Sequence, residues 1–108
     1  MIDIQKHIDY WVKTAESDIE IADILISKNK IKHGLFFCHL ILEKILKAHF
    51  IKNTGAVAPK IHDLIYLVNK SNLSLSNESV NFLIEIQRYQ LEGRYPDYEV
   101  SIPLTSES

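Results

Sequence analysis

The sequence predicts an all-α fold, an up-and-down four-helix bundle that could take a fifth helix in a longer form of the chain. Two observations lead to this prediction. Apolar residues recur at helical spacing over several long segments. Only three glycines and three prolines interrupt the 108 residues, and isoleucine and leucine dominate over valine and threonine, which favours helices over sheet.

The first two helices are predicted to form an antiparallel hairpin. The first should span about residues 4–27, and its inward positions are Ile8, Trp11, Val12, Ala15, Ile19 and Ala22. The short segment Lys28–Lys30 then reverses the chain. The second helix should begin near Ile31 and end at a left-handed cap on Gly55. It is apolar almost all the way round, a pattern typical of a helix with neighbours on several sides.

Two shorter helices are predicted to follow. The third should span about residues 62–70, and Ser76 should cap the fourth. Gly93 is expected to interrupt the fourth helix, and the segment after it is expected to be extended or turned because Pro96 disfavours helix at the residue before it.

Composition is that of one globular domain, with 46% hydrophobic and 24% charged residues. We expect the domain at residues 1–98 and an irregular tail at 99–108. No apolar run approaches the roughly 20 residues of a membrane span, and a lone Cys38 excludes an internal disulfide. These features predict a cytoplasmic protein.

Positive charge is concentrated in the middle of a chain whose net charge is −2. Residues 28–60 hold seven lysines and a single acid, Glu43. Such a region could face a phosphate-bearing ligand. For Lys28, Lys30 and Lys32 the simpler interpretation is solvation of the turn between two helices.

A thin polar stripe runs along the apolar second helix. His39, Glu43 and Lys47 are each four residues apart and therefore share one side of it. They could line a groove or a symmetric interface, or form a surface ion pair that contributes about 0.2–0.5 kcal/mol to helix stability. His39 and Glu43 also have the spacing of a metal-ligand pair, but no third ligand is evident, so no metal is predicted.

Two later positions could contact an anion. His62 follows Lys60 at the predicted start of a helix, where the helix dipole favours phosphate. The guanidinium group of Arg94 could bind phosphate bidentately, and Tyr95 could stack. The alternatives are a solvent-facing or capping His62, and a helix end at which Arg94 pairs with Asp97.

These segments together resemble the HEPN domain family, over nearly the whole chain from Trp11 to Tyr98. The most specific similarities are Glu43–Ala48, then His62–Leu64, then Arg94–Asp97 of the subgroup with an RYPDY motif. The resemblance implies an up-and-down bundle that commonly dimerises and often works beside a minimal nucleotidyltransferase. Some members of the family bind nucleotides, and others are metal-independent ribonucleases, frequently toxins.

The ribonuclease branch of the family uses an Arg followed, after four to six residues, by a His. No His occurs after His62 in this chain, so the ribonuclease motif is absent. The resemblance therefore implies ligand binding and not RNA cleavage. Carried over residue by residue, the predicted ligand or phosphate contacts are Lys47, His62, Arg94 and Tyr95. The predicted supporting residues are Glu43, His39 and Asp97.

The resulting hypothesis is a non-catalytic, dimeric domain that binds a nucleotide or phosphate, needs no cofactor, and pairs with a nucleotidyltransferase subunit, in a toxin–antitoxin-like pair. Two alternatives remain open at this point. One is a ribonuclease with a rearranged site built from His62 and Arg94. The other is a purely structural module in which the polar stripe is a dimer contact.

Overall fold

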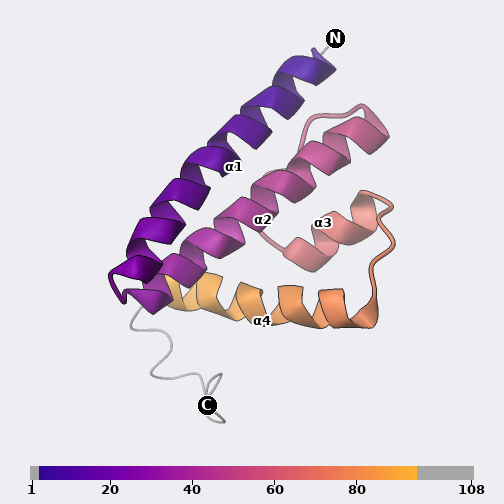
Figure 1. Ribbon diagram of the computed structural model, residues 1–108. Helices are drawn as coiled ribbons and strands as arrows, with labels where there is room; N and C mark the ends of the chain where they lie inside the picture. The colour runs from indigo at the N-terminus through magenta and orange to yellow at the C-terminus, as the bar shows by residue number, and fades with distance from the viewer. Residues whose placement is uncertain (1–2, 95–108) are drawn as a thin grey trace.

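A computed structural model describes residues 3–94 of the chain, and the side chains of residues 3–88. Within that range it holds four helices and no strand (Figure 1). The helices are α1 (Ile4–Ser27), α2 (Ile31–Thr54), α3 (Leu64–Lys70) and α4 (Asn77–Arg94). The predicted all-α bundle is thereby confirmed. No helix among the described residues is both long and apolar enough to cross a membrane.

Helices α1 and α2 form a long antiparallel hairpin (Figure 1). Asp3 begins it, because its side chain accepts a hydrogen bond from the backbone N–H of Lys6. At the other end, Asn29 adopts a positive φ of 63°, and the N–H of Lys30 donates to the carbonyl of Leu25 at 2.8 Å. A left-handed residue followed by such a bond ends a helix and reverses the chain within a few residues.

Small residues allow α1 and α2 to lie close together. Ala15 and Ala22 of α1 and Ala48 of α2 are all buried. Gly34 of α2 lies against Ile26, whose Cγ1 would be 2.5 Å from any Cβ added at position 34. On this side of α2, the two helices pack by close approach of their backbones and not by large side chains.

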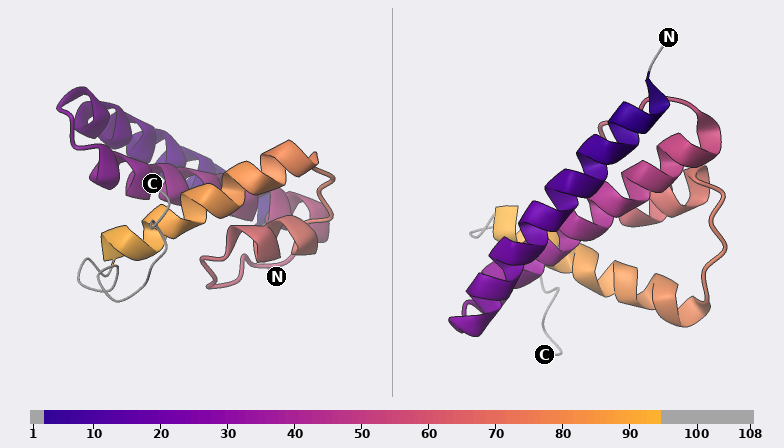
Figure 2. Two further views of the ribbon diagram at one scale, coloured as in Figure 1. Left: turned by 90° about the horizontal axis from the view of Figure 1, so that it is seen from below. Right: turned by 45° about the horizontal axis from the view of Figure 1, so that its top comes forward.

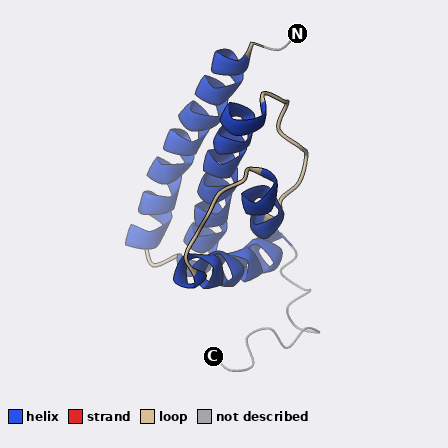
Figure 3. Cartoon of the chain, turned by 90° about the vertical axis from the view of Figure 1, so that its right-hand side faces the viewer, coloured by secondary structure: helices blue, strands red, loops and turns tan. Residues whose placement is uncertain are grey.

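The other side of α2 carries the main core. Helices α3 and α4 pack against α2 and against each other. Helix α1 packs mainly against α2. Figures 2 and 3 show α4 running obliquely across α2, with α3 in the angle between the two helices. The core consists of six buried side chains from these three helices, Leu46, Leu64, Leu67, Val68, Leu83 and Ile86. Helix α2 is therefore central, as its almost uniformly apolar sequence predicted.

Two predicted helix ends differ from the structure. Helix α3 begins at Leu64 and not near His62, because Asp63 is its N-cap and accepts from the N–H groups of Ile65 and Tyr66. Helix α4 continues through Gly93 to Arg94, so the expected interruption at Gly93 is wrong. A helix tolerates an isolated glycine at a cost of about 1 kcal/mol. The predicted boundary at residue 98 and the tail at 99–108 lie outside the described residues.

Substitution at Gly55 tests how α2 ends. Gly55 has a φ of +74°, and its N–H donates to the carbonyl of Ile51 at 2.8 Å. A Cβ in this conformation is strained, so Gly55→Ala should lower the free energy of unfolding by about 1 kcal/mol in urea denaturation. Gly55→Asn is the matched control and should lose less, because asparagine tolerates the left-handed region. Equal stability of all three proteins would contradict this account of the helix end.

Candidate functional site: a buried carboxylate beneath a basic cavity

The polar stripe of α2 lies inside the protein. His39 is 0% exposed, and Glu43 and Lys47 are each 4% exposed. The interpretation of the stripe as a surface ion pair is therefore wrong. So is the alternative that makes it a dimer contact, because these side chains are already covered within one chain. Charges so deeply buried must be paired to offset the loss of hydration.

Glu43 is the centre of a cluster drawn from two segments of the chain. The Nζ of Lys47 donates to Oε2 of Glu43 at 3.0 Å. The Nδ1 of His62 lies 2.9 Å from the same oxygen and 3.1 Å from Oε1. Because a carboxylate only accepts, the Nδ1 of His62 carries the hydrogen in this contact. The Nδ1 of His39 lies 3.7 Å from Oε1 of Glu43. Three residues predicted for the site therefore lie around the Glu43 carboxylate, namely His39, Lys47 and His62.

His62 is positioned by hydrogen bonds at both ends of α3. The backbone N–H of Leu64, two residues after His62, donates to Oε1 of Gln87 on α4. At the far end, the side-chain amide of Asn53 on α2 donates to the carbonyl of Ser71 at 2.8 Å. These bonds fix α3 between α2 and α4. As a result His62, with a side chain 52% exposed, links the buried carboxylate to the protein surface.

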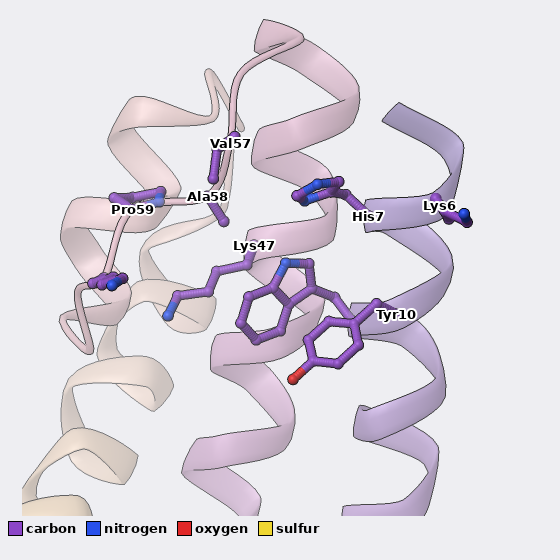
Figure 4. A pocket seen from close by; sticks show the side chains of 9 residues that line it. Lys6, His7, Tyr10, Lys47, Val57, Ala58 and Pro59 are labelled. Carbon is purple, nitrogen blue, oxygen red and sulfur yellow. The ribbon is translucent and has the colours of Figure 1, made fainter. Parts of the chain in front are cut away.

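Lys47 leads from this cluster into a cavity of about 460 Å³. Its Nζ lies 5.0 Å from the centre of the Trp11 ring, within the range of a cation–π contact. In Figure 4 the Lys47 side chain extends from α2 into the cavity, with Tyr10 on one side of it and Val57, Ala58 and Pro59 on the other. The remaining lining residues are Lys6, His7, Tyr10 and Lys60.

The lining of this cavity is basic. It includes Lys6, Lys47 and Lys60 and contains no carboxylate among the described residues. Its walls come from the beginning of α1, the middle of α2 and the loop that joins α2 to α3. Glu43 offsets the charge of Lys47, so the net positive charge of this lining comes from Lys6 and Lys60. A half-enclosed space with such a lining attracts anions.

The predicted contacts at the end of α4 remain predictions. Arg94 is the last residue of α4, and its side chain is not described, while Tyr95 and Asp97 lie outside the described residues. The backbone of Arg94 follows Gln87 by two helical turns, roughly 10 Å along the axis. Arg88, the other arginine, donates to both carboxylate oxygens of Glu85 at 2.9 and 3.0 Å.

Sequence reasoning missed several residues that build the site. Trp11 was assigned to the helix interface, yet it covers Lys47 and lines the cavity. Its identity as the only tryptophan was a usable signal, since a large amphipathic ring at a half-buried position commonly serves a contact. Tyr10 and Lys6 stand beside it. Gln87 carries no local signal, because its role depends on where α4 crosses α3.

Metal and thiol chemistry find no support in the described part of the chain. No group of three His, Cys, Asp or Glu side chains there could hold a metal ion. Burial raises the pKa of the Cys38 thiol, which disfavours the nucleophilic thiolate. Cys38 therefore behaves as a packing residue.

The fold is that of a small all-α domain whose central helix carries a buried His39–Glu43–Lys47 group. The HEPN domain family model matches residues 8–108, nearly the whole chain. The chain therefore belongs to the HEPN domain family. No curated protein and no solved structure matches it significantly.

Removal of the buried charge should be costly. Glu43→Gln leaves the Lys47 ammonium buried without its counter-charge, and we expect it to lower the free energy of unfolding by about 3–5 kcal/mol. Lys47→Met should cost less, because His62 still contacts the carboxylate. The double variant Glu43→Gln/Lys47→Met should be more stable than Glu43→Gln, because it removes both charges.

Urea denaturation measures these differences, and Glu85→Gln is the matched control. Glu85 also pairs within its helix, but it is half-exposed, so its loss should cost less than about 1 kcal/mol. Strictly additive effects at positions 43 and 47 would show that the pair is not coupled.

Proposed function

We propose that this HEPN domain binds a nucleotide or another phosphate-bearing ligand without cleaving it, and that it acts with a nucleotidyltransferase partner. The observation that carries the proposal is the cavity above Lys47, whose charged lining consists of lysines alone. Its volume of about 460 Å³ falls within the range of small-molecule pockets, about 300–1,000 Å³.

In this proposal each member of the cluster has a distinct part. Lys47 supplies positive charge at the floor of the cavity, and Glu43 orients its ammonium group. His62 holds the Glu43 carboxylate from the side of the loop and presents its half-exposed ring to solvent. Helix α4 runs toward the end of the hairpin that holds the α1–α2 turn, away from the start of α1 (Figure 1), so phosphate contacts of Arg94 and Tyr95 are proposed separately from this cavity. Pairing with a nucleotidyltransferase, in a toxin–antitoxin-like arrangement, is proposed from family membership.

Calorimetric titration with ATP, GTP and their monophosphates tests the ligand. We expect micromolar binding that weakens roughly fivefold in Lys60→Ser, since an exposed ion pair contributes about 1 kcal/mol or less. His62→Ala should also weaken ligand binding. Without His62, the Glu43 carboxylate interacts more strongly with the Lys47 ammonium, which is then less available to the phosphate. Lys28→Ser, an exposed lysine at the far end of the hairpin, is the control. Millimolar or weaker binding that none of these changes alters would contradict the proposal.

The same proteins test the absence of catalysis. Structured and single-stranded RNA should remain intact when incubated with the purified domain in buffer that contains a metal chelator. Cleavage that His62→Ala abolishes would instead support the ribonuclease alternative. Co-expression with a minimal nucleotidyltransferase, followed by size-exclusion chromatography with light scattering, tests the partner, and separate elution of the two proteins would count against it.

Dimerisation is proposed through a different surface from the polar stripe. A second cavity of about 480 Å³ between α2 and α4 is lined by Leu42, Ile45, Leu75 and Phe82, among others. Ile45 and Phe82 are exposed, and Ile45 also borders a third hollow against α1. Exposed apolar side chains grouped around such a cavity favour an interface.

Sedimentation velocity tests this surface. The wild type should sediment as a dimer, and Phe82→Glu should sediment as a folded monomer because it places a charge in the apolar contact. Ile24→Glu is the matched control, since Ile24 is as exposed as Phe82 but lies outside the three cavities described. A monomeric wild type would overturn the dimer, and the ligand proposal would stand.

A further inference from the structure

The cavity above Lys47 is chemically divided. Its cationic groups are Lys6, Lys47 and Lys60. The rest of its lining is almost entirely aromatic or aliphatic, namely Tyr10, Trp11, Val57, Ala58 and Pro59, with His7 beside them. A ligand that satisfies both parts must carry negative charge at one place and an apolar or planar group at another.

The aromatic part is a preformed corner. Tyr10 and Trp11 are consecutive residues whose ring centres are 5.1 Å apart at an interplanar angle of 76°. Tyr10 is 59% exposed, so a large ring stands open to solvent at the mouth of the cavity. In Figure 4 the Tyr10 ring projects from α1 on the side of the cavity that faces Lys47, and Lys47 contacts the Trp11 ring. Two rings at a steep angle offer one face and one edge to a third ring, the arrangements that aromatic groups prefer.

The wall facing this corner has no polar side-chain atoms. Val57, Ala58 and Pro59 come from the loop between α2 and α3, and Val57 is exposed. His62 holds the end of this loop onto Glu43. Side chains of this kind cannot form the hydrogen bonds that distinguish one heterocycle from another by its edge. They contact a planar ring by packing against it.

The same lysine joins the two parts of the cavity. Lys47 is paired with Glu43 at 3.0 Å, and its Nζ lies 5.0 Å from the centre of the Trp11 ring. A phosphate beside this ammonium therefore places any attached ring within reach of Trp11. The ion pair also holds the lysine in place before a ligand arrives, which reduces the entropy lost on binding.

We infer that the cavity takes a phosphate ester of a planar aromatic ring, such as a nucleoside monophosphate, and selects it by ring stacking and charge, not by the hydrogen-bonding edge of the ring. The ring lies between the Tyr10–Trp11 corner and the loop at 57–59, and the phosphate lies beside Lys47 and Lys60. This inference rests on the proposed phosphate binding and adds to it a ring subsite and a rule of selectivity.

Intrinsic fluorescence provides a direct test, because Trp11 is the only tryptophan in the chain. Binding of AMP or GMP should quench it to similar extents and with affinities within about threefold of each other. UMP, with a smaller ring, should bind more weakly. Ribose 5-phosphate, which has the phosphate but no aromatic ring, should bind at least tenfold more weakly than AMP by calorimetry and leave the fluorescence unchanged.

Tyr10→Leu isolates the ring subsite while keeping Trp11 as the probe. It should weaken AMP roughly tenfold, within the range measured for base–aromatic stacking, and leave ribose 5-phosphate unchanged. Tyr66→Leu is the matched control, since Tyr66 is an exposed tyrosine on α3 that does not line the cavity. Circular dichroism of both variants confirms that they fold.

The outcomes separate the two proposals. If AMP and ribose 5-phosphate bind equally and Tyr10→Leu changes neither, the ring subsite is overturned and phosphate binding stands. If AMP binds more than tenfold tighter than GMP, selection by the edge of the ring replaces selection by stacking. If no phosphate compound binds, both proposals fail. Quenching by AMP that Tyr10→Leu weakens supports the inference.

Discussion

The carboxylate of Glu43 is paired with groups that come from two distant parts of the chain. Lys47 lies one helical turn after Glu43 on α2. His62 lies nineteen residues after Glu43, at the end of the loop that follows α2. At 4% exposure the carboxylate has almost no access to water, so its charge depends on these partners. The loop, the start of α3 and the middle of α2 are therefore held in one arrangement. The wall of the basic cavity belongs to that same loop.

Helix α1 completes the site because of its register on α2. Small residues bring the two backbones close together, and an ion pair of 2.6 Å joins Asp18 of α1 to Lys44 of α2. Asp18 is 7% exposed, so separating it from Lys44 would leave a buried charge without its partner. A shift of α1 by one residue would rotate its side chains by about 100° and carry Trp11 away from Lys47. The packing that stabilises the hairpin thus also places the aromatic side of the cavity.

Local signals along the chain predicted the helices well. Gly55 lies where a cap was expected, and the bounds of α1 and α2 agree with the apolar spacing. The error at Gly93 shows the limit of such signals, since helical context overrode a residue with weak helix propensity. For the site, the four-residue spacing placed His39, Glu43 and Lys47 on one side of α2, and the family resemblance added His62. The contact between His62 and Glu43 came only from the tertiary structure. Gln87 and Trp11 could not be found in that way, because their partners are distant in the sequence.

The sequence by itself determined that this is an all-α HEPN domain with its polar residues on the central helix, because helix spacing and capping are local properties. Only the tertiary structure decided that the stripe of α2 is buried and not exposed. An almost uniformly apolar helix carries no periodicity that says which side faces solvent. The cavity likewise exists only because α1, α2 and one loop meet around Lys47. Its chemistry depends on distances between residues that the order of the chain does not encode locally.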